Sequence, residues 1–128
     1  MKRLVLDLDG TLTVASEQAS YAGQPPNLAV IEKVREYKLA GFEIIIASSR
    51  NMRTLGNSIG KINALTLPVM IEWLRQHDVP FDEIHVGKPW CGYDGFYVDD
   101  KAIRPSEFQA LSYREIQRIL QREAGGER

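Results

Sequence analysis

Four short segments, each at least half apolar and separated by longer amphipathic stretches, constrain most strongly how this chain can fold. They predict strands over residues 3–6, 42–47, 83–86 and 96–98. The first two runs are continuous rather than alternating, which is typical of strands buried on both faces. Strands that alternate with helices are joined by right-handed crossovers and form a largely parallel sheet. We therefore expect an α/β domain whose sheet is covered by helices on both faces.

Capping signals place helices between these runs. Asn27 is predicted to cap a helix that ends at Gly41, and Thr66 to cap a second helix with Pro68 in its first turn. The polar stretch 48–64 between the second strand and this helix is expected to be irregular.

The length of 128 residues fits a single domain, 1–128, which can bury most of its apolar surface. Ser112 and Glu115 have capping-box spacing, so they predict a C-terminal helix over about 112–122. The tail 123–128 is expected to be frayed.

Charge and cysteine content exclude several classes of protein. The net charge of -1 gives no general attraction to nucleic acid or to acidic membranes. Cys91, as the single cysteine, excludes an intramolecular disulfide and any multi-cysteine metal site. No apolar run approaches the roughly 20 residues of a spanning helix, and residues 1–9 do not resemble a signal peptide. We expect a cytoplasmic protein without a membrane partner.

Polar side chains follow all four predicted strands. Ligands of parallel α/β sheets bind at the carboxyl ends of the strands, so these side chains are expected to converge on one edge of the sheet. The set consists of Asp7 and Asp9 after the first strand, Ser48 and Arg50 after the second, Lys88 after the third, and Asp99 and Asp100 after the fourth.

This set suits phosphoryl transfer. Residues two apart on a strand share a face, so Asp7 and Asp9 are expected side by side, where their mutual repulsion calls for a cation such as Mg²⁺. Asp7 can attack phosphorus as a nucleophile, and Asp9 can protonate the leaving oxygen and then deprotonate water. Mg²⁺ held by Asp7 and Asp99 would offset the repulsion between nucleophile and phosphate. Ser48 and Lys88 would hold the transferring oxygens.

The order and placement of these residues resemble the four motifs of the haloacid dehalogenase-like hydrolases, namely Asp7-Leu8-Asp9-Gly10-Thr11, Ser48, Lys88 and Asp99-Asp100. The resemblance implies a Rossmann-like three-layer α/β/α domain and an aspartyl-phosphate intermediate on Asp7, with Asp9 as acid and base. It also implies Mg²⁺ bound by the Asp7 carboxylate, the Asp9 backbone carbonyl and Asp99. Asp100 would support or share this set of ligands.

The same resemblance assigns the candidate phosphate-binding residues, which are Thr11, Ser48, Ser49 and Lys88. One departure is the second motif, where Ser48-Ser49-Arg50 replaces the commoner Thr-Gly-Arg. Serine keeps the hydroxyl, so activity is expected to survive the change.

Neither 13–42 nor 50–86 has room for the cap domain that many of these hydrolases insert. The chain thus resembles the capless subgroup, whose open sites take large substrates or use a neighbouring subunit as a lid, and a homo-oligomer is possible. Stretches 49–54, 87–92 and 97–105 are similar to small phosphatases linked to bacterial capsular polysaccharide biosynthesis. The expected function is a Mg²⁺-dependent phosphatase acting on a sugar phosphate or related metabolite.

Several alternatives remain open at this stage. Arg50, Asn51 and Arg53 are candidate substrate contacts, although both arginines could equally be solvated loop charges. Specificity is expected to reside in the flap 14–27, the loop 51–63 and any neighbouring subunit. A signalling receiver domain uses similar groups but in a different order along the chain.

Two further alternatives share the fold. A non-catalytic member of the family would usually lack the acid and base at Asp9. A phosphatase acting on nucleic-acid ends is disfavoured by the near-neutral charge, although the basic loop 50–61 is compatible with it.

Overall fold

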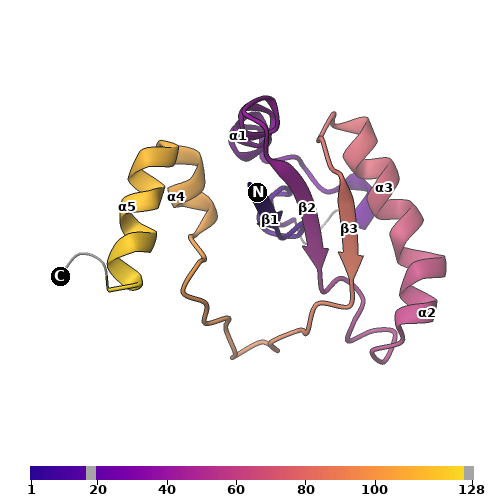
Figure 1. Ribbon diagram of the computed structural model, residues 1–128. Coiled ribbons are helices and arrows are strands. Elements are labelled where there is room, and N and C mark those ends of the chain that lie inside the picture. Colours follow the sequence, from indigo (N-terminus) through magenta and orange to yellow (C-terminus); the bar gives the residue numbers. More distant parts are fainter. Residues whose placement is uncertain (17–19, 126–128) are drawn as a thin grey trace. The chain divides into compact units, whose positions relative to one another are not determined.

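A parallel sheet forms the framework of the N-terminal part of the chain (Figure 1). The computed structural model describes residues 1–16 and 20–125, and within them the sheet has the order β1 (Arg3–Leu6), β2 (Glu43–Ser48), β3 (Glu83–Val86). All neighbouring strands are parallel, with Ile46 of β2 paired to Leu6 on one side and to Ile84 on the other. The predicted α/β fold with a Rossmann-like parallel sheet, flanking helices and no evident cap domain is confirmed.

The chain divides into two units, Met1–Trp90 and Cys91–Arg128. The first unit contains the sheet and the helices that follow β1 and β2. The second contains α4 (Pro105–Ala110) and α5 (Tyr113–Glu123). The structure defines each unit internally, and a single domain over the whole chain stays a prediction.

The central strand is the most deeply buried part of the sheet. Ile44, Ile45 and Ile46 of β2 are at most 3% exposed, as their continuous apolar sequence predicts. Within the first unit β1 has one neighbouring strand and Val5 is 61% exposed, so burial of β1 on both faces stays a prediction.

Helix α1 (Leu28–Leu39) begins and ends where the sequence predicts. The Asn27 side chain accepts a hydrogen bond from the Val30 amide at 3.4 Å, as an N-cap does. Gly41 has φ +97°, a conformation that favours glycine and ends the helix. The helix packs against β2 and buries four apolar or aromatic side chains, Val30, Ile31, Val34 and Tyr37.

The second predicted helix begins earlier than its sequence indicates. Three helical segments follow one another without a break, α2 (Ile59–Lys61), the π-helical turn η2 (Ile62–Thr66) and α3 (Leu67–Gln76). Ser58 caps them, since its hydroxyl accepts a hydrogen bond from the Lys61 amide at 3.3 Å.

Thr66 is therefore not the N-cap, and that prediction is wrong. Its backbone is already helical, and its hydroxyl donates to Asn51 Oδ1 at 2.7 Å. The threonine is bound to a residue 15 positions earlier, a tertiary contact that local spacing does not reveal. The stretch 48–64 is also less irregular than predicted, because it is helical from Ile59 onward.

The predicted flap 14–27 is closed at its base. Val14 donates a backbone hydrogen bond to the Pro25 carbonyl at 2.7 Å, and η1 (Tyr21–Gly23) forms one short turn within the segment. Residues 17–19 lie outside the described residues.

The second unit departs from prediction at its start. Residues 91–104 contain no helix or strand, so the predicted strand over 96–98 is wrong. Phe96 and Val98 are 79% and 87% exposed. A strand exists only where a neighbour pairs with its backbone, and three apolar residues between Gly95 and Asp99 do not specify that neighbour.

The end of the second unit agrees with the sequence. Ser112 Oγ accepts a hydrogen bond from the Glu115 amide at 3.2 Å, and the Glu115 carboxylate accepts one from the Ser112 amide at 2.9 Å. This capping box starts α5 one residue from the predicted position. Residues 126–128 of the predicted frayed tail lie outside the described residues. In the described ranges, the helices are too short or too polar to cross a membrane.

Asp82, which directly precedes β3, contacts both α1 and β2. Its substitution therefore tests whether these contacts stabilise the first unit. Lys38 Nζ on α1 lies 2.8 Å from both carboxylate oxygens, and the Ile44 amide of β2 donates to Oδ2 at 2.8 Å. The hydrogen bond from Lys38 lowers the pKa of Asp82. The carboxylate thus stabilises the fold above the ordinary pKa of aspartate, and this contribution is lost as the pH falls through the lowered pKa.

We expect Asp82→Asn to lower the melting temperature at neutral pH and to have little effect in acid, where Asp82 is protonated. Thermal unfolding at several pH values measures both effects. Asp94→Asn, the same change at an exposed position of the second unit, should alter the melting temperature little at any pH. Equal effects of the two substitutions would contradict the assignment.

Candidate active site

The two first-motif carboxylates follow β1, as the sequence predicts, but they lie in a tight turn, so the alternation of strand side chains that places them on one face does not apply to them. β1 ends at Leu6, and the Leu8 carbonyl accepts backbone hydrogen bonds from Thr11, Leu12 and Thr13 at 3.3, 2.9 and 3.1 Å. Gly10 adopts φ +80° within this turn, which a side chain would disfavour. The turn therefore fixes the backbone from which both carboxylates project.

Thr13 holds the same turn from inside the protein. It is 1% exposed, and its hydroxyl accepts a hydrogen bond from the Gly10 amide at 3.1 Å. Thr13 is not among the predicted site residues. The signal available was a threonine three positions after Gly10, between the apolar residues Leu12 and Val14.

Asp7 is partly buried and surrounded by charges. Its Oδ1 accepts a hydrogen bond from the Leu8 amide at 2.8 Å. Burial raises the pKa of the Asp7 carboxyl, the positive charge of Lys88 and the Leu8 hydrogen bond oppose this, and the Asp9 carboxylate raises the pKa further. Asp9 and Lys88 therefore lie near enough to Asp7 to act on its charge, as their strand-end positions predict.

Asp9 forms a bidentate ion pair with Arg50. Arg50 Nε donates to Asp9 Oδ2 at 3.0 Å and Nη2 donates to Oδ1 at 2.7 Å. The arginine side chain is 1% exposed and that of Asp9 is 37% exposed. Arg50 is therefore not a solvated loop charge, which was one of the two readings open from the sequence. Its role as a substrate contact stays a prediction.

The aromatic ring of Tyr21 completes the surroundings of Arg50. The guanidinium carbon lies 4.3 Å from the ring centroid, within the range of a cation–π interaction. Within the described ranges the buried Nη1 atom has no hydrogen-bond partner. Nothing in the local sequence signals this contact, because Tyr21 and Arg50 are 29 positions apart and the intervening chain includes a helix and a strand.

The second motif is built from the end of β2. Ser48 is 1% exposed, and its Oγ accepts a hydrogen bond from the Arg50 amide at 3.0 Å. Ser49 is half-buried, and its carbonyl accepts a hydrogen bond from the Met52 amide at 3.0 Å. Both serines thus shape the loop that carries Arg50. Their predicted binding of phosphate, like that of half-exposed Thr11, stays a prediction.

Lys88 is held against the same strand end. Its backbone amide donates to the Ser48 carbonyl at 3.1 Å. Gly87, just before it, has φ +83°, and a Cβ at this position would overlap the Ile59 side chain. The positive φ therefore favours glycine at the position through which the chain reaches Lys88, and a larger residue there would also require the end of the Ile59 side chain to move.

The other two predicted substrate residues, Asn51 and Arg53, lie on the loop after β2. Asn51 has φ +63°, accepts a hydrogen bond from Thr66, and donates one to Thr54 Oγ1 at 2.9 Å, so it organises the loop. Arg53 is exposed on that loop.

Asp99 and Asp100 belong to the second unit, and both are exposed. Asp99 Oδ1 accepts a hydrogen bond from the Lys101 amide at 2.8 Å, so this carboxylate caps a turn. The structure brings Asp7, Asp9, Ser48, Arg50 and Lys88 together in the first unit. A shared site with Asp99 and Asp100 stays a prediction.

The donor chemistry of the first unit fits part of a magnesium site. Burial and the neighbouring Asp9 charge disfavour the ionised form of the Asp7 carboxylate, so a bound cation would stabilise it. The Asp9 backbone carbonyl offers a second hard oxygen. Within residues 1–16 and 20–125 no cluster of three His, Cys, Asp or Glu side chains is arranged to hold a metal. Carboxylate and carbonyl oxygens are ligands that Mg²⁺ accepts, and Mg²⁺ keeps several of its waters.

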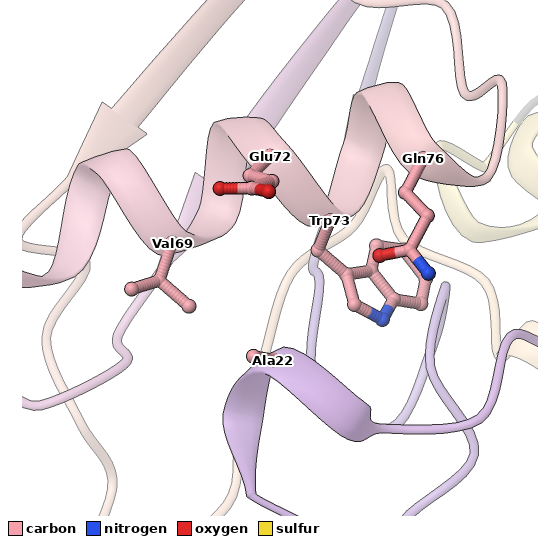
Figure 2. Close-up of a pocket in the computed structure, with 5 residues that line it drawn as sticks. All are labelled: Ala22, Val69, Glu72, Trp73 and Gln76. Atoms are coloured by element: carbon pink, nitrogen blue, oxygen red, sulfur yellow. The ribbon is translucent and has the colours of Figure 1, made fainter.

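A small hollow elsewhere in the first unit is not this site. It lies between η1 and α3 and is lined by Ala22, Val69, Glu72, Trp73 and Gln76, as Figure 2 shows. None of the predicted site residues lines it.

Comparisons with known proteins place the chain in a class. The sequence profile of the haloacid dehalogenase-like hydrolases matches residues 4–72, more than half of the chain, and the protein belongs to this family. A crystal structure of a target protein from Vibrio cholerae is similar, with 55% identity and a TM-score of 0.93 over 96% of this chain and 99% of that one.

A more distant similarity is to D,D-heptose 1.7-bisphosphate phosphatase from B. bronchiseptica, complexed with magnesium and phosphate. The two share 18% identity over 98% of this chain and 64% of that one, with a TM-score of 0.48. A structural similarity at this identity and TM-score supports no argument about activity. No curated protein sequence matches the chain.

Asp7 is expected to lower the stability of the metal-free protein. Because burial raises its pKa above the ordinary value, the ionised carboxylate destabilises the fold, and this cost develops as the pH rises through the ordinary and then the raised pKa. Asp7→Asn should therefore increase the free energy of unfolding in urea at neutral pH with EDTA. The difference should disappear below the ordinary pKa of aspartate. A less stable Asp7→Asn variant at neutral pH would contradict the role of burial.

Gly87→Ala should destabilise the fold through two effects, backbone strain and overlap with Ile59. We expect a loss of about 2–5 kcal/mol in urea unfolding, from about 1–2 for the left-handed conformation and about 1–3 for overpacking. Gly56→Ala is the matched control, because Gly56 also has positive φ but has no atom within 4 Å of an added Cβ. It should lose about 1–2 kcal/mol. Equal losses of unfolding free energy in the two variants would show that the Ile59 side chain moves aside at little cost.

Proposed function

We propose that this protein is a Mg²⁺-dependent phosphatase that hydrolyses a phosphomonoester through an aspartyl-phosphate on Asp7. The observation that carries the proposal is the partly buried Asp7 carboxylate at the carboxyl end of β1, with its charge under the influence of Lys88, Asp9 and Arg50. Membership of the hydrolase family agrees with it.

The proposed chemistry has two steps. An Asp7 oxygen attacks phosphorus, the bond from phosphorus to the alcohol oxygen breaks, and that oxygen takes a proton from the Asp9 carboxyl. Water then attacks phosphorus, the Asp9 carboxylate takes its proton, and the bond from phosphorus to Asp7 breaks. Asp9 thus returns to its starting state, and phosphate is released.

The negative charge of the transferring phosphoryl group must also be offset. Lys88, Ser48, Ser49 and Thr11 are the residues proposed to hold the phosphate oxygens. Mg²⁺ would be held by the Asp7 carboxylate and the Asp9 backbone carbonyl, with Asp99 as a further ligand and Asp100 in support. When bound, the ion supplies positive charge that offsets the repulsion between Asp7 and the phosphate.

The proposed substrate is a sugar phosphate or a related metabolite of capsular polysaccharide biosynthesis in the cytoplasm. Support comes from the resemblance of 49–54, 87–92 and 97–105 to phosphatases of that kind. The absence of an evident cap domain favours an open site, with a second copy of the chain as a candidate lid. The flap 14–27 and the exposed Arg53 are the proposed specificity elements.

The pairing of Arg50 bears on the nucleic-acid alternative. Nucleic acid binds through positive charge that is available to its phosphates. Arg50 is buried and paired with Asp9, so the basic loop 50–61 presents one positive charge fewer than its sequence suggests. This observation favours a small substrate over a nucleic-acid end, and the presence of Asp9 favours catalysis over binding alone.

Turnover of a panel of phosphorylated sugars, nucleotides and oligonucleotides, assayed by phosphate release with Mg²⁺, tests the proposal. We expect the highest kcat/KM with a sugar phosphate, complete loss of turnover with EDTA, and recovery when Mg²⁺ is added back. Asp7→Asn should lose turnover by at least about a thousandfold, because no nucleophile remains. Added Mg²⁺ should raise the melting temperature of the wild type but not of Asp7→Asn.

The outcomes separate the parts of the proposal. Retained turnover in folded Asp7→Asn would overturn the aspartyl-phosphate mechanism, and preference for oligonucleotides would favour the alternative. Glu72→Gln, in the hollow away from the site, is the control and should keep wild-type turnover.

A further inference from the structure

A chain of three side chains connects the flap to the proposed proton carrier. The ring of Tyr21 covers the Arg50 guanidinium, and the guanidinium holds both carboxylate oxygens of Asp9. We propose that Tyr21 is a positioning residue, which acts through Arg50 to hold the Asp9 carboxylate in place for proton transfer. This inference rests on the proposed phosphatase function, and it gives the flap a role in the chemistry as well as in specificity.

Hydrogen bonds hold the flap backbone before and after η1, the short turn that contains Tyr21. The Ser16 amide donates to the Gln24 side chain, and Gln24 Nε2 donates back to the Ser16 carbonyl, both at 3.1 Å. The buried Trp73 of α3 donates from its indole to the Gln24 carbonyl at 2.9 Å. These bonds fix the backbone near η1, so the position of the Tyr21 ring is set by the body of the first unit.

Arg50 depends on this ring because it is a buried cation. Its side chain is 1% exposed, its Nε and Nη2 are used on Asp9, and Nη1 has no hydrogen-bond partner in the described part of the chain. A buried charge is tolerated only where its surroundings compensate for lost water. The face of an aromatic ring is attractive to a cation, and this attraction is stronger where water is excluded.

Asp9 in turn depends on Arg50. Both oxygens of the Asp9 carboxylate accept a hydrogen bond from Arg50, and a bidentate pair fixes the plane of the carboxylate as well as its position. The side chain is 37% exposed, so one side is accessible to a substrate. If Arg50 moves toward water, Asp9 loses the contact that orients it.

Orientation of Asp9 matters most when the alcohol is a poor leaving group. When the phosphorus–oxygen bond breaks, the oxygen of an alkyl phosphate needs the proton of Asp9, whereas a nitrophenolate leaves without it. The value of kcat/KM reports the steps up to alcohol release. A misplaced Asp9 should therefore lower kcat/KM for an alkyl phosphate and spare it for an activated aryl phosphate.

The experiment compares wild type, Tyr21→Leu and Tyr21→Phe on glucose 6-phosphate and 4-nitrophenyl phosphate. We expect Tyr21→Leu to lower kcat/KM about tenfold or more for the alkyl substrate and less than about threefold for the aryl substrate. Tyr21→Phe keeps the aromatic face and should recover most of the loss. Tyr113→Leu, the same change at a tyrosine of similar exposure in the second unit, is the matched control and should affect neither substrate.

A second measurement follows the contact itself. The Arg50 Nε–H bonded to Asp9 should give a slowly exchanging side-chain signal in a ¹H–¹⁵N spectrum, assigned by its loss in Arg50→Lys. We expect Tyr21→Leu to abolish protection of this signal and Tyr21→Phe to keep it.

Four results would overturn the proposal. Equal losses for both substrates, or a rise in KM as the main effect, would mean that Tyr21 contacts substrate or only supports the fold. An unchanged Nε–H signal in Tyr21→Leu would mean that the ring does not hold Arg50. A wild type that hydrolyses no phosphomonoester would overturn the proposed function and the catalytic role with it, whereas the spectrum would still decide whether Tyr21 holds Arg50.

Discussion

The ion pair between Asp9 and Arg50 is the interaction on which the rest of the candidate site depends. It joins the turn after β1 to the loop after β2, so it fixes two of the motifs relative to each other. Arg50 is buried whereas Asp9 is partly exposed, so removal of Asp9 would leave an uncompensated buried charge and be strongly destabilising. The arrangement therefore ties the presence of Asp9 in the site to the integrity of the fold.

The parts of the molecule that follow from local sequence were predictable. The strands β1, β2 and β3 lie where the sequence predicts strands, and Asn27, Gly41 and Ser112 stand at helix ends as their residue types suggest. The convergence of Asp7, Asp9 and Lys88 followed from a general rule about parallel sheets. Each of these inferences needs only the period of a pattern or the chemistry of a single terminus.

The parts that depend on contacts between distant residues were not predictable. Thr66 has the sequence context of a helix cap, yet its hydroxyl bonds to Asn51. The sequence leaves Arg50 open between a substrate contact and a solvated loop charge, and only the folded chain shows that it is buried against Asp9 and Tyr21. The run 96–98 is apolar enough for a strand, but apolarity does not specify a partner to pair with. In each case the deciding partner lies far away in the sequence.

The backbone bond from Lys88 to Ser48 has a consequence for how the site could change shape. The amide of Lys88 donates to the Ser48 carbonyl directly after the paired residues of β2 and β3, so the ladder between these strands continues to the two candidate phosphate ligands. Neighbouring strands in a sheet keep a nearly constant spacing of about 4.8 Å. The backbones of Ser48 and Lys88 are therefore held at a fixed separation. Any adjustment to a larger or smaller phosphorylated group must come from side-chain rotation or from the flap rather than from separation of the strands.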